Sequence, residues 1–294
     1  MNSASKGLVV ISGASRGIGR AIALALADAA CANRDKSSSS IISSHLHMVL
    51  MARSASSLQE TAEMLQQRCE KGNSTTITTT CHEMDLADID SLPQNVNKIL
   101  EPLADENYSS CLLINNAGSL GPLGNATAIC GDEESSPESL RRWKDAIDFN
   151  ITSSLWISSK FAKATSHIPL VRVVNISSLC AIDPFPTMSL YCAGKTARDM
   201  FHSVLAKEQT SPQVDGEEAA PSTKVLNYAP GACSTEMTDI LADSADLDNE
   251  LHQFFSTSRD KGELVRPDDT AFKLVRLLMK DEFETGSHVD YWDV

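Results

Sequence analysis

The chain has 294 residues and a formal net charge of −14, and no run of lysine and arginine offers the basic surface that nucleic acid or an anionic membrane requires of a partner. A small anionic cofactor remains compatible with this charge, because it needs only a local cationic pocket. Doubly wound α/β proteins of this length commonly fold around one sheet, so residues 1–294 are expected to form a single domain.

The N-terminus and the cysteines indicate a cytoplasmic protein. The apolar stretch Gly7–Ile11 is too short for a signal peptide, and no apolar run approaches the ~20 residues that span a bilayer. Eight cysteines without C-x-x-C spacing predict reduced thiols, with no disulfide framework and no zinc site. They are Cys31, Cys69, Cys81, Cys111, Cys130, Cys180, Cys192 and Cys233.

Short β-branched runs alternate with helical patterns along the chain, which is typical of βαβ units. The predicted strands are Leu8–Ser12, Met48–Met51, Thr76–Glu83, Cys111–Asn115, Val171–Ser177, Val225–Tyr228 and His288–Tyr291. The predicted helices are Ile18–Ala30, Ser57–Arg68, Pro137–Ser166, Tyr191–Glu208 and Asp268–Met279. Because such crossovers are right-handed, the pattern predicts an α/β fold, a Rossmann-like doubly wound parallel sheet of about seven strands with helices on both faces.

Three segments are expected to be inserted surface loops, because they are rich in Ser, Gly, Pro or acidic residues: residues 33–44, 131–136 and 209–223. The tract Ser37–Ser40 has a second interpretation, a phosphorylation target, although its flanking residues give this no support. No internal repeat and no linker between domains is visible.

A glycine-rich turn connects the first predicted strand to the first predicted helix. Its sequence is Ser12-Gly13-Ala14-Ser15-Arg16-Gly17-Ile18-Gly19. Backbone N–H groups and the helix dipole at such a turn attract a pyrophosphate, and glycine lets the phosphate come close. The spacing G-x-x-x-G-x-G departs from the G-x-G-x-x-G fingerprint, so the strand-turn-helix context carries the prediction of a nucleotide site.

The end of the second predicted strand indicates which dinucleotide binds. An acidic residue there would bind the 2′-hydroxyl of NAD, but the segment Met51–Ser54 contains none. Arg53 and Arg16 have planar forks of donors suited to a 2′-phosphate, which predicts NADPH. The alternative is that both arginines are ordinary surface charges. Further candidates for contact with the adenine ring and the cofactor's edge are Asp85, Leu86 and Asn116.

Tyr191 and Lys195 are four residues apart, so on a helix they share one face. Such a pair alone is usually a solvated surface pair, and its value here comes from two further polar residues. Ser178 follows the fifth predicted strand, thirteen residues before Tyr191, and Asn150 lies within the predicted helix 137–166. The spacing to the tyrosine favours Ser178 over the adjacent Ser177.

The chain resembles the short-chain dehydrogenase/reductase family over essentially its whole length. The resemblance rests on the type and order of five features: the glycine turn, the segment Asn115–Gly118, the helix asparagine, the serine and the Tyr-x-x-x-Lys pair. This resemblance implies an oxidoreductase with a tetrad of Asn150, Ser178, Tyr191 and Lys195. The cofactor-binding residues that we expect are Gly13, Ser15, Arg16, Gly17, Ile18, Gly19, Arg53, Ser54, Asp85, Leu86, Asn116, Lys195, Cys233, Ser234, Thr235, Glu236, Met237 and Thr238.

The chemistry of carbonyl reduction explains these residue types. Hydride attack on a carbonyl carbon builds negative charge on the oxygen, which must be protonated as the charge forms. Tyr191 is expected to donate this proton, and the charge of Lys195 to lower the tyrosine pKa from ~10 towards neutral pH. Ser178 would hold the carbonyl oxygen, Lys195 would also fix the nicotinamide ribose, and Asn150 would support a water path that returns the proton.

Longer stretches resemble the pterin-reducing branch of the family, and they are Leu113–Gly121, Ile176–Ala181, Tyr191–Lys195, Val225–Gly231, Lys280–Phe283 and Gly286–Asp290. This resemblance implies reduction of side-chain ketones of pterins by a cytoplasmic homodimer, in the last step of tetrahydrobiopterin formation. It implies that Gly231 lies at the substrate, that residues 233–238 close over the nicotinamide and that Asp290 anchors the pterin. From spacing alone, Asp290 could equally belong to a solvated acidic tail. The three insertions and Ser12, where many relatives have threonine, depart from the family pattern.

Two other functions remain open on the sequence. A general carbonyl reductase acting on diketones or steroids would keep the tetrad but need an apolar pocket. A non-catalytic NADP-sensing protein would keep the glycine turn but usually lose part of the tetrad, whereas all four residues are present.

Overall fold

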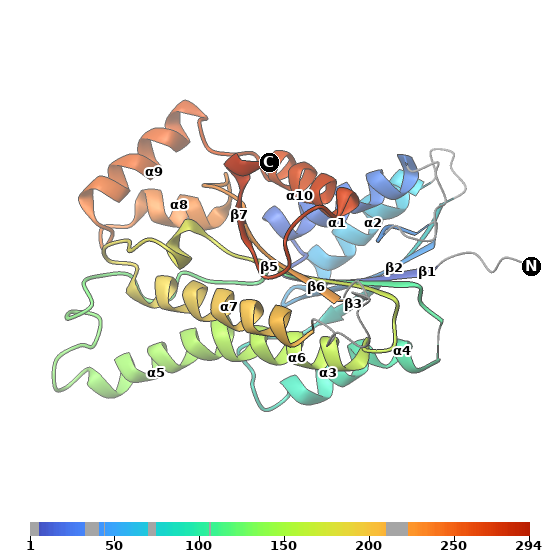
Figure 1. Ribbon diagram of the computed structural model, residues 1–294. Helices are drawn as coiled ribbons and strands as arrows, with labels where there is room; N and C mark the ends of the chain where they lie inside the picture. The colour runs from blue at the N-terminus through green and yellow to red at the C-terminus, as the bar shows by residue number, and fades with distance from the viewer. Residues whose placement is uncertain (1–5, 33–40, 44, 70–74, 106, 210–222) are drawn as a thin grey trace, which may run out of the picture.

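Seven parallel strands form one sheet in the order β3-β2-β1-β4-β5-β6-β7 (Figure 1). The computed structural model describes residues 6–32, 41–43, 45–69, 75–105, 107–209 and 223–294. The strands are β1 Lys6–Ser12, β2 His45–Ala52, β3 Thr76–Glu83, β4 Ser110–Asn115, β5 Leu170–Ile176, β6 Thr223–Ala229 and β7 His288–Asp290. All seven predicted strands are confirmed, with small differences at their ends.

The central strands are buried on both faces, as their runs of Val, Ile and Leu predict. In β1 the side chains from Leu8 to Ile11 are at most 1% exposed. β3 is instead an edge strand rich in threonine, and its side chains are all half-buried or exposed. The apolar interior therefore centres on β1 and β4, the two strands that flank the glycine turn.

Helices cover both faces of the sheet (Figure 1). They are α1 Gly17–Ala32, α2 Ala55–Cys69, α3 Leu92–Leu100, α4 Pro102–Asp105, α5 Ser136–Ile147, α6 Ser153–Ala164, α7 Ser189–Glu208, α8 Glu236–Asp243, α9 Asn249–Lys261 and α10 Pro267–Lys280. α1, α2 and α10 share one buried cluster, which includes Leu58 and Leu274. α3, α4, α6 and α7 share the cluster on the other face, which includes Val96 and Leu205. α8 and α9 pack around a smaller cluster at Leu241.

The helix predicted over 137–166 is present but is not regular throughout. α5 and α6 are joined by a π-helical segment, Asp148–Thr152, which contains Asn150. One extra residue per turn locally rotates the side chains that follow, and such segments are frequent at functional sites. The other four predicted helices correspond to α1, α2, α7 and α10, while α3, α4, α8 and α9 were not predicted.

The three predicted insertions are only partly surface loops. Residues 33–40, with the serine tract, and residues 44 and 210–222 lie outside the described part of the chain. Ile41 and Ile42 are buried in the core, so the prediction of a surface loop is wrong for this pair. Burial removes their apolar side chains from water, which lowers the free energy of the folded chain. Thr223 also belongs to β6 rather than to a loop. Of the predicted loop 131–136, residues 131–135 precede α5 and Ser136 is the first residue of that helix. The Asp132 carboxylate accepts a hydrogen bond from the Ser135 N–H at 2.9 Å.

The connections reverse direction between β1 and β4, because the chain first winds outward through β2 and β3 and then through β5, β6 and β7. In an open parallel sheet, the carboxyl ends of the strands at such a switch point border a crevice in which ligands bind. Among the described residues, no helix is long and apolar enough to cross a membrane.

Candidate active site

The glycine turn is locked to the end of β4. Ser12 Oγ accepts hydrogen bonds from the N–H groups of Asn116, at 3.0 Å, and Ala117, at 3.1 Å. The Asn116 amide in turn donates to the carbonyl of Gly13 at 3.1 Å. Gly13 has φ +67°, and a Cβ at Gly19 would lie 2.2 Å from the carbonyl oxygen of Gly13. Glycine is therefore required at both positions, and the N-terminus of α1 stays open to a ligand.

A cavity of about 1530 Å³ runs from this turn across the carboxyl ends of the strands to α8, α9 and the C-terminal residues. Small-molecule sites usually measure ~300–1,000 Å³, so this cavity has room for a dinucleotide and a substrate together. Most of the predicted site residues line it: Gly13, Ser15, Arg16, Gly17, Ile18, Arg53, Ser54, Leu86, Asn116, Ser178, Tyr191, Lys195, Gly231, Cys233, Ser234, Thr235, Glu236, Met237, Thr238 and Asp290. Gly19, Asp85 and Asn150 are not among its lining residues.

The two predicted phosphate-binding arginines differ in their surroundings. Arg16 forms an ion pair with Glu236, the first residue of α8, so this pair connects the glycine turn to the opposite wall of the cavity. Arg53 is exposed at the end of β2 and makes no ion pair with any residue in the described part of the chain. Arg53 is thus the cation at this end of the cavity whose donors are available to an anion.

Ser178, Tyr191 and Lys195 come together at the inner end of the cavity. Ser178 follows β5 and caps a 3₁₀ turn, Leu179–Ala181, by accepting from the Cys180 N–H at 3.2 Å. Lys195 is 6% exposed, and its Nζ donates to the Ile176 carbonyl at 2.7 Å. The same Nζ lies 5.5 Å from the centre of the Tyr191 ring. The serine, the phenol and the ammonium are therefore held by β5 and the first two turns of α7.

Asn150 lies behind this group. Its side chain is buried, with Oδ1 accepting from the Ser119 N–H at 2.8 Å and Nδ2 donating to the Ser119 carbonyl at 3.1 Å. A Cβ at Gly118 would be 3.6 Å from Asn150 Oδ1 and 3.8 Å from Lys195 Nζ. Asn150 therefore positions the loop after β4 next to the lysine, from a place outside the cavity lining.

The pKa values of this group differ from the sequence-based expectation. Burial raises the pKa of Tyr191, and the neighbouring Cys180 adds to the rise, while a hydrogen bond with Ser178 opposes it. Burial, followed by the charge of Arg198, lowers the pKa of Lys195 to about 7. The prediction that Lys195 lowers the tyrosine pKa is wrong for this structure, because burial raises the pKa of Tyr191 and also disfavours the charged form of Lys195.

A buried polar network behind the tetrad was missed from the sequence. Arg198 is 1% exposed and donates to the carbonyls of Asn115, at 2.6 Å, and Ala117, at 2.8 Å, and to Asn175 Oδ1 at 2.7 Å. Asp199 accepts from Asn175 Nδ2 at 2.9 Å. The network fixes α7 to the ends of β4 and β5. The signal was present, because Tyr191, Lys195 and Arg198 follow helical spacing on one face of α7.

Three predicted residues, Gly231, Met237 and Asp290, line the substrate end of the cavity. Gly231 has φ +77°, and a Cβ there would lie 3.6 Å from the Cβ of Tyr291. Tyr191 Oη donates to Met237 Sδ at 3.9 Å, which brings the segment after β6 over the phenol. Asp290, the last residue of β7, accepts from the Trp292 N–H through one carboxylate oxygen, at 3.0 Å.

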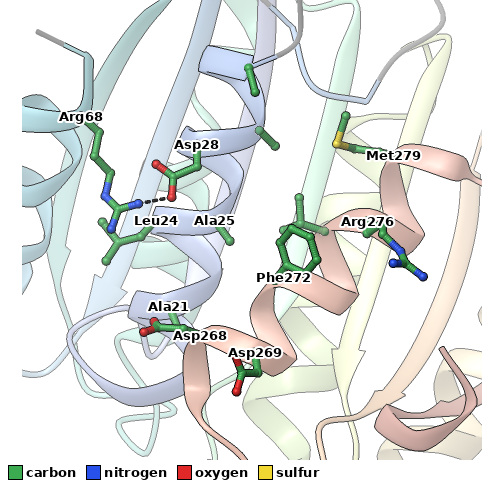
Figure 2. Close-up of a pocket in the computed structure, with 13 residues that line it drawn as sticks. Ala21, Leu24, Ala25, Asp28, Arg68, Asp268, Asp269, Phe272, Arg276 and Met279 are labelled. Carbon is green, nitrogen blue, oxygen red and sulfur yellow. Dashed lines mark hydrogen bonds and ion pairs between the residues drawn. The ribbon is translucent and has the colours of Figure 1, made fainter. Parts of the chain in front are cut away.

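Figure 2 shows a second, smaller hollow of about 900 Å³, in which side chains of α1 and α10 face each other. Four alanines of α1 are among its lining residues, with the exposed Phe272 on one side and an ion pair between Asp28 and Arg68 on the other. It contains no serine, tyrosine, histidine or cysteine. Within the described part of the chain, no three His, Cys, Asp or Glu side chains are grouped so as to hold a metal ion. The candidate catalytic side chains Ser178, Tyr191 and Lys195 line the larger cavity instead.

Comparisons with known proteins show the family to which the chain belongs. The family described as short chain dehydrogenase matches residues 7–245. Sepiapterin reductase of Rattus norvegicus is 36% identical over 287 residues, covering 97% of this chain and 96% of the relative. A benzil reductase of Bacillus cereus is 27% identical, covering 95% and 96%.

Solved structures show the same fold. The KRED1-Pglu enzyme superposes with a TM-score of 0.71 at 20% identity, covering 96% of this chain and 100% of that chain. L-Sorbose reductase of Gluconobacter frateurii superposes with a TM-score of 0.69 at 19% identity, covering 98% and 95%. With the family match over most of its length, the chain belongs to the short chain dehydrogenase family of oxidoreductases.

Proposed function

We propose that this chain is an NADPH-dependent reductase of side-chain ketones on pterins such as sepiapterin and 6-pyruvoyl-tetrahydropterin. The observation that carries the proposal is a single cavity lined by three groups of residues. The glycine turn and Arg53 form the cofactor end, Ser178, Tyr191 and Lys195 form the reacting group, and Asp290 lies at the substrate end. The whole-length similarity to sepiapterin reductases supports the pterin substrate. These residues lie on β7, on the turns that follow other strands of the same sheet, and on α7, which packs against that sheet, and this supports one domain over 1–294.

The residues present fit NADPH. The positive φ of Gly13 and the close contact at Gly19 leave the N-terminus of α1 free of side chains, as a pyrophosphate requires. β2 ends without a carboxylate, and Arg53 offers free donors for a 2′-phosphate. Arg16, Leu86, Asn116 and residues 233–238 line the rest of the dinucleotide path.

In this mechanism, bound NADPH supplies the hydride. Ser178 holds the carbonyl oxygen by a hydrogen bond, and Tyr191 gives that oxygen a proton as its negative charge grows. Lys195, fixed by the Ile176 carbonyl, holds the nicotinamide ribose. Asn150 keeps the loop after β4 in place and supports the path by which water returns the proton.

Arg53→Ala is expected to weaken NADPH binding about tenfold or more and to leave NADH binding nearly unchanged, since only NADPH carries the 2′-phosphate. A charge-assisted hydrogen bond is worth ~1.5–3 kcal/mol, which corresponds to at least this factor. Titration of both cofactors by fluorescence measures the effect. Arg276→Ala removes an exposed arginine outside the cavity and is the control. Equal losses for NADPH and NADH in Arg53→Ala would mean that Arg53 is structural.

Asp290 is the proposed anchor of the pterin. A pterin presents an exocyclic amine beside a ring N–H, and a carboxylate accepts both of these donors. The proposal is supported by two observations: Asp290, at the end of β7, lines the cavity, and one of its carboxylate oxygens accepts a hydrogen bond from the Trp292 N–H. Its carboxylate is therefore held in a fixed orientation, which argues against a solvated acidic tail.

Asp290→Asn is expected to raise the KM for sepiapterin at least about tenfold, the equivalent of ~1.4 kcal/mol, because half of the acceptor face becomes a donor. The asparagine can keep the bond to Trp292 through its remaining oxygen, so the turn should persist. Small diketones lack the paired donors, and their turnover should barely change. Asp269→Asn, an exposed carboxylate outside the cavity, is the matched control. If Asp290→Asn impaired the turnover of sepiapterin and of the diketones equally, or of neither, Asp290 would not be the anchor of the pterin.

A general diketone reductase is the second candidate, and the apolar residues of the cavity favour it, including Phe185, Met188 and Leu241. The similarity to benzil reductases at 27% identity points the same way. It predicts that diketones outperform pterins in steady-state kinetics. The stronger similarity to sepiapterin reductases and the placement of Asp290 favour the pterin.

We also propose a homodimer in the cytoplasm. α5 packs against α7, and both helices carry apolar side chains in contact with water, including Leu140, which is 70% exposed, and Met200, which is 64% exposed. A second copy of the chain would cover them. Sedimentation equilibrium should give the mass of two chains, and the mass of one chain would contradict the dimer. Free thiols such as those of Cys111, Cys180 and Cys233 support a reducing compartment.

A further inference from the structure

The C-terminal tryptophan is the most exposed of the large apolar side chains in the described residues. Trp292 is 75% exposed and lines the cavity together with Asp290. Single exposed apolar residues are common on protein surfaces, so the exposure alone assigns nothing. The surroundings of Trp292 decide what its ring can do.

The turn that carries Trp292 is closed at both ends by carboxylates. Asp290 accepts from the Trp292 N–H at 3.0 Å, and Asp293 accepts from the Asp290 N–H, also at 3.0 Å. The Tyr291 and Trp292 rings meet edge to face, with 4.8 Å between their centres and 84° between their planes. The indole is therefore oriented by its own turn and by the neighbouring ring.

Lys273 ties this turn to α10, beside which the C-terminus lies in Figure 1. Its Nζ lies 4.0 Å from the centre of the Tyr291 ring and donates to the Tyr291 carbonyl at 2.8 Å. A cation over an aromatic ring is worth roughly 0.5–1 kcal/mol at an exposed site. The lysine thus fixes Tyr291, and Tyr291 fixes the indole, so the exposed ring is held in place before any ligand binds.

We propose that Trp292 is a specificity-determining residue whose indole stacks on the fused heteroaromatic ring of the substrate, with Lys273 as a positioning residue. The inference rests on the proposed pterin reductase function. Asp290 and Trp292 are two residues apart on one tight turn, so a flat ring whose edge binds the carboxylate passes within reach of the indole. An aliphatic ketone offers neither the paired donors nor the flat face.

Trp292→Ala is expected to raise the KM for sepiapterin about tenfold and to leave kcat nearly unchanged, because stacking on one heteroaromatic ring contributes ~1–3 kcal/mol. Trp292→Phe keeps a ring and should recover most of the affinity. Turnover of a small aliphatic diketone should not change in either variant. Phe272→Ala removes another exposed aromatic side chain, one that lies outside the cavity in the hollow of Figure 2, and should alter neither substrate.

A fluorescence titration tests the stacking and the positioning directly. The chain has three tryptophans, so Trp143→Phe with Trp156→Phe leaves Trp292 as the single indole. Sepiapterin should then quench its emission in a saturable way. Lys273→Met in this background should weaken the binding that the quenching reports, and Lys273→Arg, which keeps the cation, should restore it.

The outcomes separate this inference from the function on which it rests. If the native protein reduces sepiapterin and Trp292→Ala leaves its KM unchanged, the stacking role is wrong while the proposed function stands. If saturable quenching occurs but Lys273→Met does not weaken it, the role of Lys273 is wrong. If the native protein does not reduce sepiapterin, both the proposed function and this inference fail.

Discussion

Tyr191→Phe is expected to lower kcat for ketone reduction ~10²–10⁴-fold, the usual contribution of a positioned general acid, because the ring remains and only the proton donor is lost. Affinity for NADPH should stay nearly intact. Burial raises the pKa of Tyr191, so the phenol is fully protonated at neutral pH and ready to act as an acid. Steady-state rates and a cofactor titration measure the two quantities.

The control is the same chemical change at a remote site. Tyr108 is buried, its hydroxyl bonds to His47, and neither residue lines the cavity. Tyr108→Phe should therefore leave kcat unchanged. If Tyr191→Phe retained more than about a tenth of the wild-type rate, another group would have to be the acid.

Arg198→Ala is expected to reduce the free energy of unfolding by about 3–5 kcal/mol, because two carbonyls and the Asn175 side chain lose their donors inside the protein. Burial lowers the pKa of Arg198 to about 10, so the guanidinium remains charged at neutral pH. Arg198→Lys should recover little stability, since one ammonium cannot replace a planar fork bonded to three acceptors. Urea unfolding followed by circular dichroism measures the change.

Arg266→Ala is the control, because this arginine is exposed and its only ion pair among the described residues, with Asp268, is long at 3.6 Å. Its effect should be within ~0.5 kcal/mol. A loss below about 1 kcal/mol in Arg198→Ala would show that water replaces the missing donors and that the network does not hold α7 in place.

The sheet could be predicted from the sequence because its signal is local. A run such as Leu8–Ile11 combines β-branched and apolar residues, and the glycines that follow mark the turn into α1. Some of the helices that the prediction missed have weak local signals. α9, for example, is mostly polar, and the side chains it buries are Phe255 and Ser258. Such a helix is stabilised by tertiary packing rather than by a pattern that the sequence displays.

Most of the site residues predicted from the sequence line the cavity, but the electrostatics of the site could not be predicted. Tyr191 and Lys195 were placed on one face by their spacing, and both line the cavity. Their pKa values depend instead on burial and on Arg198, which the tertiary structure brings to 2.6 Å from the Asn115 carbonyl, 83 positions away in the chain. The burial of Ile41 and Ile42 could not be predicted for the same reason. An apolar pair in a serine-rich stretch is buried only if the tertiary structure provides an apolar surface against which it packs.

The most direct test of the account is NADPH oxidation by the wild-type protein with sepiapterin, measured against a panel of simple diketones under the same conditions. We predict that kcat/KM is at least about tenfold higher for sepiapterin, since the diketones cannot use Asp290, and tenfold corresponds to ~1.4 kcal/mol. Equal or greater kcat/KM for the diketones would contradict the pterin function and favour a general carbonyl reductase, and no oxidation of NADPH with any ketone would contradict the reductase itself.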